Sequence, residues 1–176
     1  MNNKVIMTLS SEPCKNEAVS RFFGAPTVPG EWFDDEIFSE GEVFICQIAL
    51  ADLTDFGGYG LLPDDGYLYF FFDIEDKVNP LRIRFFAGAP DTVVEDFNES
   101  IDFDIPKDEY SVIFSRDGAG TIGASISATE LVGDEVILLD FENADARLFT
   151  FLGNCKKIKI SKEAVKSLRF DEARFV

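Results

Sequence analysis

The chain has 176 residues, enough for one domain, or for two small halves that share a core. It carries 33 acidic against 16 basic side chains, a net charge of −17 at pH 7, which disfavours binding to nucleic acids and anionic membranes. The complete absence of histidine excludes Ser-His-Asp and Cys-His catalysis, histidine general bases and H-E-x-x-H zinc sites.

The apolar runs and the cysteines indicate a cytoplasmic protein. No apolar run approaches the ~20 residues that a transmembrane helix needs, and the stretch 5–7 is too short for a signal peptide. Cys14, Cys46 and Cys155 are an odd count without C-x-x-C spacing, so we expect neither a disulfide framework nor a zinc site. A reducing cytoplasm is the expected location.

In chain order, the first expected elements are a short helix within 15–22 and a strand over 43–50. The segment "VFICQIAL" (43–50) is apolar without alternation, which is typical of a strand buried on both faces. A short helical turn, a glycine-rich loop and a Pro-Asp-Asp-Gly turn follow it. The next strand is expected over 67–73.

The remaining elements are mostly strands. Segments 81–86 and 101–105 alternate apolar and charged residues, as half-buried strands do. Further strands are expected over 111–114, 135–141, 146–152 and 156–160, and a short helix with Ser161 as its N-cap. The sequence therefore predicts a single domain over 1–176 with an α+β, predominantly β fold, antiparallel sheets and few short helices.

The segment "YLYFFFD" (67–73) has two interpretations. Alternation would point Tyr67, Tyr69 and Phe71 to one side of a sheet and Leu68, Phe70 and Phe72 to the other. A central strand covered on both sides explains the run without a ligand, and we favour this core interpretation. The alternative is an exposed aromatic wall for a partner peptide.

A weak internal repeat links the two halves. "GAP" (24–26), "EVFICQI" (42–48) and "GYLYFF" (66–71) recur in order as "GAS" (123–125), "EVILLDF" (135–141) and "ARLFTF" (146–151). This pattern predicts repeat units of about 20–110 and 111–176 that lie side by side around one core, because each is too short to close its own.

In this order, the segments resemble the YwqG-like family of bacterial proteins. The most specific part runs from "EVFICQIALADL" (42–53) to "GLLPDDGYLYFFFDIED" (60–76), preceded by "SRFFGAPTVPGEW" (20–32). "DEVILLDFENADARLFTFL" (134–152) and "SKEAVKSLRFDEARF" (161–175) resemble the second half of that family. The chain departs from the family at Phe33, where a proline is usual, and at "ENADA" (142–146), where a Trp-Gly-Asp turn is usual.

The resemblance implies a β-rich α+β fold with two similar halves and no established activity. Some members resemble antitoxin-type neighbours of polymorphic toxins, an association rather than a mechanism.

Carboxylates are the remaining candidates for chemistry. The glycine-rich segments 57–60 and 118–123 do not open a helix after a strand, so we expect no phosphate site and no cofactor. Asp102 and Asp104 would share a strand face about 7 Å apart, a spacing that suits a divalent cation or a pair of catalytic acids. With so many acids in the chain, a solvated face is the simpler interpretation.

Two functions follow from these patterns. The favoured one is a non-catalytic acidic binding module for a basic protein partner, and the alternative is a carboxylate-based hydrolase or divalent-cation-binding protein. No catalytic or metal-binding residue is assigned. The candidate partner-binding residues are Asp34, Asp35, Glu36, Asp73, Glu75, Asp76, Glu95, Asp96, Asp102 and Asp104.

Overall fold

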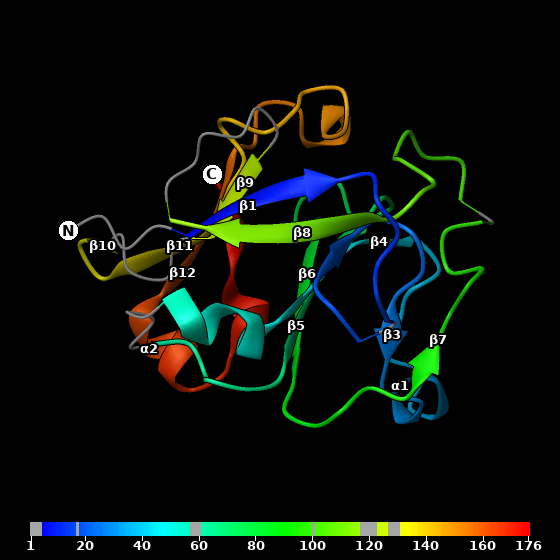
Figure 1. The fold of residues 1–176 in the computed structure, drawn as a ribbon, viewed down its shortest axis with the longest axis horizontal. Coiled ribbons are helices and arrows are strands. Elements are labelled where there is room, and N and C mark those ends of the chain that lie inside the picture. Colours follow the sequence, from blue (N-terminus) through cyan, green and yellow to red (C-terminus); the bar gives the residue numbers. More distant parts are fainter. Residues whose placement is uncertain (1–4, 17, 57–60, 100, 117–122, 127–130) are drawn as a thin grey trace.

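The computed structural model describes residues 5–16, 18–56, 61–99, 101–116, 123–126 and 131–176 (Figure 1). The strands are β1 Val5–Ser10, β2 Arg21–Phe22, β3 Thr27–Val28, β4 Glu42–Ala49, β5 Tyr67–Asp73, β6 Leu81–Phe86, β7 Thr92–Val93, β8 Tyr110–Ser115, β9 Gly123–Ile126, β10 Leu131–Val132, β11 Glu135–Asp140, β12 Lys157–Ser161 and β13 Arg174–Phe175. The helices are α1 Glu31–Asp34 and α2 Lys162–Lys166, with 3₁₀ helices η1 Leu50–Phe56, η2 Thr150–Leu152 and η3 Phe170–Glu172.

Eleven of the described strands form one antiparallel sheet in the order β13-β12-β11-β9-β1-β8-β2-β4-β5-β6, with β10 beside β11. β3 and β7 pair antiparallel in a separate small sheet. The predicted fold class, predominantly β with antiparallel sheets and few short helices, is confirmed.

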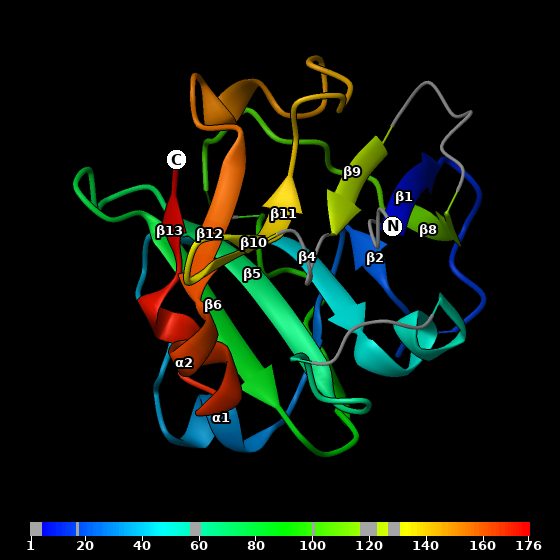
Figure 2. The same cartoon turned by 90° about the vertical axis from the view of Figure 1, so that its left-hand side faces the viewer.

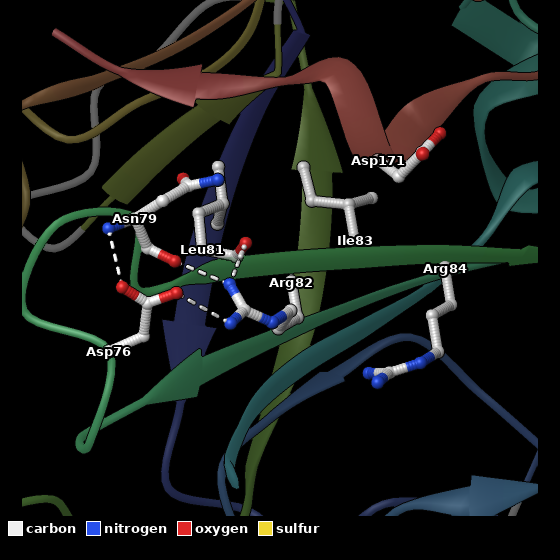
Figure 3. Close-up of a pocket in the computed structure, with 7 residues that line it drawn as sticks. All are labelled: Asp76, Asn79, Leu81, Arg82, Ile83, Arg84 and Asp171. Carbon is white, nitrogen blue, oxygen red and sulfur yellow. Dashed lines mark hydrogen bonds and ion pairs between the residues drawn. The ribbon is translucent and has the colours of Figure 1, made fainter. Parts of the chain in front are cut away.

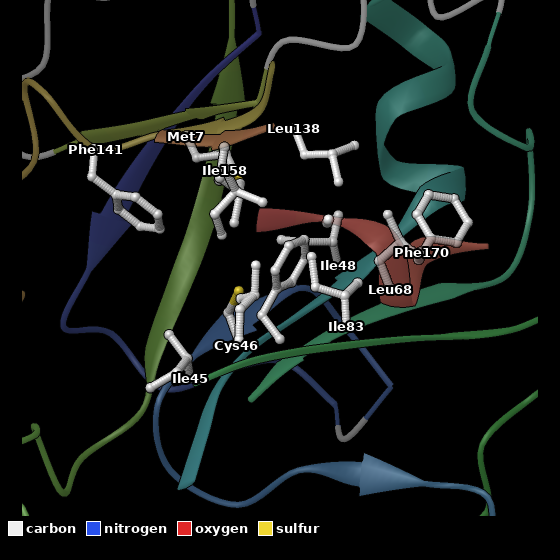
Figure 4. Close-up of a cluster of buried hydrophobic side chains, with 14 of the residues drawn as sticks. Met7, Ile45, Cys46, Ile48, Leu68, Ile83, Leu138, Phe141, Ile158 and Phe170 are labelled. Carbon is white, nitrogen blue, oxygen red and sulfur yellow. The ribbon is translucent and has the colours of Figure 1, made fainter. Parts of the chain in front are cut away.

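The aromatic run forms β5, which lies between β4 and β6 and is covered on both faces. Tyr69 and Phe71 belong to one buried cluster, whereas Leu68 and Phe70 belong to another. Figure 4 shows Leu68 among the side chains of the larger cluster. The core interpretation of the run is therefore confirmed, and the exposed aromatic wall is wrong.

The larger cluster, here called the inner core, forms because the long sheet curls around it. Phe170 of η3 packs on Phe85 of β6, with ring centroids 5.7 Å apart, and Phe175 of β13 packs 6.1 Å from Phe72 of β5. These contacts bring the two ends of the sheet order together (Figure 2). Phe170 is buried, and full burial of such a ring stabilises the fold by roughly 1.5–3 kcal/mol.

The smaller cluster, here called the outer core, lies on the other face of β4 and β5. Trp32 of α1 packs edge-on against Tyr69, with ring centroids 5.2 Å apart. The Tyr69 hydroxyl donates a 2.7 Å hydrogen bond to the carbonyl of Thr27 in β3, so the polar end of this buried ring is satisfied. β3, β7 and α1 thus form a layer over this face, gathered on one side of the molecule in Figure 1.

Most predicted strands are present. The strands expected at 43–50, 67–73, 81–86, 111–114, 135–141 and 156–160 correspond to β4, β5, β6, β8, β11 and β12. Leu81 and Ile83 are buried on one face of β6, and Arg82 and Arg84 point to the other, as the alternation predicts.

Three element predictions are wrong. Residues 101–105 alternate between half-buried and exposed, and their apolar side chains pack on the inner core, but they pair with no described strand. The N–H groups of Phe103 and Ile105 donate instead to the carbonyls of Ile101 and Phe103. The segment 146–152 forms a turn and η2 rather than a strand. The described residues of 15–22 form turns and β2 rather than a helix.

The internal repeat is not confirmed. Its third matched segment, 146–151, is not a strand, and β11 pairs with β12 instead. The second matched segments do share a feature, since both strands carry a register irregularity, between Phe44 and Cys46 in β4 and between Ile137 and Leu139 in β11. The first matched segment of the second copy, 123–125, lies within β9, which pairs with β11, whereas its counterpart 24–26 follows β2, which pairs with β4.

The helix expected after Ser161 is confirmed as α2. The Ser161 hydroxyl accepts a 3.1 Å hydrogen bond from the N–H of Ala164, the side-chain cap that its position predicts. Nowhere in the described ranges does a helix reach the length and apolar character that crossing a membrane requires.

Candidate functional site: an acidic surface around Phe33

Five of the ten candidate acids lie on two segments that the fold brings together. Asp34, Asp35 and Glu36 are exposed in and just after α1, and Glu95 and Asp96 are exposed just after β7. The two segments are about sixty residues apart in sequence but lie in the same layer, next to each other, because β3 pairs with β7. Neither segment 31–42 nor segment 87–106 contains a lysine or an arginine.

The end of α1 places Glu36 in an unusual backbone conformation. Glu36 has φ 51°, its N–H donates to the Phe33 carbonyl, and the N–H of Ile37 donates to the Trp32 carbonyl. This is the Schellman pattern of helix termination, whose left-handed position is usually glycine. A carboxylate side chain therefore occupies a position that the backbone alone would assign to glycine.

Hydrogen bonds connect the α1 segment to the β7 segment. The Asp91 carboxylate accepts a 2.8 Å bond from the N–H of Gly30 and a bond from the Thr92 hydroxyl. These two donors hold the pKa of Asp91 below its usual value, because both stabilise the charged carboxylate. The N–H of Val94 also donates to the carbonyl of Pro26. The relative position of the two acidic segments is thus fixed by several contacts.

Phe33 lies where two hollows meet. Phe33 is 41% exposed, which is unusual for phenylalanine, and the other described aromatic residues are buried or half-buried. The first hollow, of about 430 Å³, lies beside α1 and is lined by Trp32, Phe33, Glu36, Phe38, Ser39, Glu40, Glu42, Phe97 and Ile101. The second, of about 680 Å³, is lined by Phe33, Thr92, Val93, Val94, Glu95, Asp96 and Glu99.

We call this combination the α1–β7 surface: Phe33 with Glu36 and Glu40 on one side and Glu95, Asp96 and Glu99 on the other. An exposed ring surrounded by carboxylates offers apolar contact area together with a negative field. These two features suit a basic protein surface, for which the field accelerates encounter and the ring adds contact energy.

A different group of candidate acids is neutralised within the protein. Asp73 is 5% exposed and accepts hydrogen bonds from Arg82 (3.2 Å) and Ser39 (2.9 Å). Asp76 accepts a 2.9 Å bond from the same guanidinium, beside a hollow of about 320 Å³ along β6 (Figure 3). The N–H of Asn79 and then Arg82 lower the pKa of Asp76. Asp73 and Asp76 therefore stabilise the β5–β6 connection, whereas Glu75 is exposed.

Asp102 and Asp104 are both exposed, but the shared strand face expected for them is absent because 101–105 is not a strand. Within the ranges that the structure describes, no group of three or more acids and cysteines is arranged to hold a metal ion. Asp145, like Asp76 and Asp91, has a lowered pKa, here because Arg147 donates to it. A general acid needs the opposite shift.

The hollow beside Cys14 gives no support to a catalytic thiol. Cys14 lines a space of about 580 Å³ together with Asp52, Asp55 and Phe56. Burial, and then the charge of Glu109, raises the pKa of the Cys14 thiol, which disfavours the nucleophilic thiolate. Burial also raises the pKa of Cys46 well above its usual value, as its apolar neighbours in the sequence predict.

Sequence reasoning missed three members of the α1–β7 surface, namely Phe33, Glu40 and Glu99. Phe33 follows Trp32 directly, and the two rings point to different environments only because α1 is a single turn with one buried side. Segments 31–42 and 87–106 contain no lysine or arginine, and this pattern could have indicated Glu40 and Glu99.

In comparisons with known proteins, no family model matches the chain, and no curated protein matches it.

Proposed function

We propose that this protein is a non-catalytic binding module that holds a basic protein partner on its α1–β7 surface. One observation carries the proposal. Two base-free acidic segments, distant in sequence, are held together around the exposed ring of Phe33.

The distribution of neutralising partners supports this assignment. Glu42, Asp73 and Asp76 are paired with Arg84 or Arg82, so their charges are already satisfied within the fold. In contrast, no hydrogen bond or ion pair with another described residue engages the side chains of the α1–β7 surface acids. Their charge remains available to an external cation.

The αL conformation of Glu36 supports the same assignment. A non-glycine residue at this position costs about 1 kcal/mol or more. Glu36 lies beside the hollow next to Phe33, where a carboxylate contributes to a binding surface but not to any described internal contact. Residual strain of this kind is common at functional positions.

An immunity-type or regulatory role is the specific form of this proposal, in line with the resemblance to the YwqG-like family. The alternative, a carboxylate hydrolase or cation-binding protein, has no specific support among the described residues. Asp76, Asp91 and Asp145 have lowered rather than raised pKa values.

Affinity capture with a matched control tests the proposal. The wild-type protein, a Glu95→Lys/Asp96→Lys variant and an Asp64→Lys/Asp134→Lys control are immobilised and incubated with native lysate at low salt. All four acids are exposed. Each variant replaces two acids by lysines and so changes the net charge equally, but only the first changes the α1–β7 surface. Eluted proteins are identified by mass spectrometry as the salt concentration rises.

We expect the wild type and the control to retain the same basic protein, which elutes as salt rises, and the Glu95→Lys/Asp96→Lys variant to lose it. Retention of that protein by all three baits, or only at high salt, would contradict the proposed surface.

A further inference from the structure

The first hollow beside Phe33 has walls of aromatic rings. The ring of Phe38 lies 5.4 Å from that of Phe33 and 5.2 Å from that of Phe97, centroid to centroid, and 6.1 Å from that of Trp32. Because Phe33 is exposed and the other three rings are half-buried or buried, one side of this group is open to solvent. Ring faces carry partial negative charge, which attracts a cation.

Two carboxylates lie at the rim of the same hollow. Glu36 and Glu40 are exposed and line it, and neither side chain is paired with another described residue. A ligand group that fits this hollow should therefore carry a positive charge for the two carboxylates and a flat face that stacks on the rings.

The protein already holds one group of this chemistry against the same ring. The Arg84 guanidinium lies 4.9 Å from the Phe38 ring centroid and 5.1 Å from that of Phe71. It also donates two 2.6 Å hydrogen bonds to the Glu42 carboxylate. Glu42 and Phe38 both line the hollow. One ring and one carboxylate of the lining thus already hold a planar cation from within the protein.

From these observations, we infer that the first hollow binds an arginine side chain of the basic partner. The inference rests on the proposed function and adds the identity of the side chain that is recognised. Arginine is favoured over lysine because its guanidinium is planar and weakly hydrated, so that it stacks on rings while it donates to two carboxylates. Lysine would gain the charge attraction but not the stacking.

A pair of peptides tests this specificity directly. One is a short lysine-only peptide, and the other has the same length and charge but carries arginine at its centre. Trp32, the only tryptophan of the chain, lines the hollow, so its fluorescence reports binding there. We expect the arginine peptide to bind roughly threefold to tenfold more tightly at low salt, with a change in Trp32 emission.

Two variants test whether the preference for the arginine peptide arises in this hollow. Phe33→Leu keeps apolar volume but removes the exposed ring, and Glu40→Gln removes one rim charge with little change in shape. We expect each to reduce the arginine preference toward unity, while the Asp64→Lys/Asp134→Lys control retains it. Circular dichroism and urea midpoints confirm that both variants fold, since Phe33 and Glu40 are exposed.

The outcomes separate the two proposals. If both peptides bind equally and salt weakens both, the arginine site is wrong and the acidic surface stands. If neither peptide binds, the arginine site and the proposed basic partner are both contradicted. An arginine preference that persists in Phe33→Leu and Glu40→Gln places recognition elsewhere and overturns the inference.

Discussion

Glu36 has a backbone conformation that a side chain disfavours. It occupies the left-handed position that ends α1, and Leu168 occupies the equivalent position after α2, with φ 57°. Both positions favour glycine for the same steric reason. Only Glu36 lies beside the hollow at Phe33, so the two residues form a natural comparison.

We therefore expect Glu36→Gly to raise the free energy of unfolding by about 0.5–1 kcal/mol and to weaken capture of a basic partner. Leu168→Gly is the matched control, with a similar gain in stability and unchanged capture. Urea denaturation and the capture assay measure the two effects. A destabilised Glu36→Gly variant would show that the carboxylate makes a contact that stabilises the fold.

Among single residues, Glu42 and Arg84 form an ion pair whose charges are largely buried, so each depends on the other. The Glu42 side chain is 2% exposed and that of Arg84 is 17% exposed, so neither charge can be left unpaired without a large loss. Glu135 and Arg174 pair in a corresponding way between β11 and β13 but are more exposed, at 29% and 56%. Exposed pairs contribute much less.

Glu42→Gln is expected to lower the free energy of unfolding by about 3 kcal/mol, because it leaves a buried guanidinium without its counter-charge. The double variant Glu42→Gln/Arg84→Met should recover part of this loss. Glu135→Gln, the exposed control, should cost less than about 1 kcal/mol. A double-mutant cycle from urea midpoints checks these values, and equal losses for Glu42→Gln and Glu135→Gln would contradict the argument.

At the scale of elements, the small layer of β3, α1 and β7 determines the site. α1 has four residues and could not persist alone, since isolated helices of this length are unstable in water. Trp32 anchors it to the outer core, and Asp91 connects its start to β7. The acidic segments keep a defined spacing because this layer packs on β4 and β5.

The hydrogen bond from the Gly30 N–H to the Asp91 carboxylate predicts a pH-dependent change. The pKa of Asp91 is lowered in the folded state. The charged carboxylate therefore contributes fully to the stability of the fold above the usual pKa of 3.8, and this contribution is lost as pH falls through the lower folded pKa. We expect the amide proton shift of Gly30 to titrate by NMR with an apparent pKa below 3.8. The titration should vanish in Asp91→Asn. A Gly30 shift that titrates unchanged in that variant would exclude Asp91 as its origin.

Considered for the whole molecule, the net charge of −17 is expected to act in opposite directions on stability and on the proposed binding. Self-repulsion destabilises the compact state, whereas attraction to the proposed basic partner would depend on the same charge. Salt screens both interactions between exposed groups.

Added sodium chloride at neutral pH should therefore raise the urea midpoint of the free protein and at the same time weaken capture of the proposed basic partner. Sodium chloride is preferred to sulfate, because sulfate also strengthens apolar burial. A midpoint that falls with salt would indicate that attractive pairs such as Glu42–Arg84 outweigh the repulsion.

Local patterns of apolar residues accounted for much of the fold. The double burial of 67–73, the two faces of 81–86 and the Ser161 cap are each consequences of side-chain periodicity or local hydrogen bonding, which neighbouring residues determine. The segment 101–105 shows the limit of this reasoning. Its alternation is real, but a strand also needs a partner edge, and periodicity does not reveal whether one is present.

Composition and local patterns are enough to establish that the chain is acidic and ring-rich, lacks histidine, and folds mainly as β-strands. They do not reveal which acids are available. Asp73 and Glu95 look alike in sequence, yet Asp73 is paired with Arg82 inside the fold and Glu95 is exposed beside Phe33. A charge is neutralised by the groups that lie within a few ångströms in space, and the folded chain brings those groups from distant positions. The pairing of β3 with β7 that joins the two acidic segments is a contact between residues far apart in the chain.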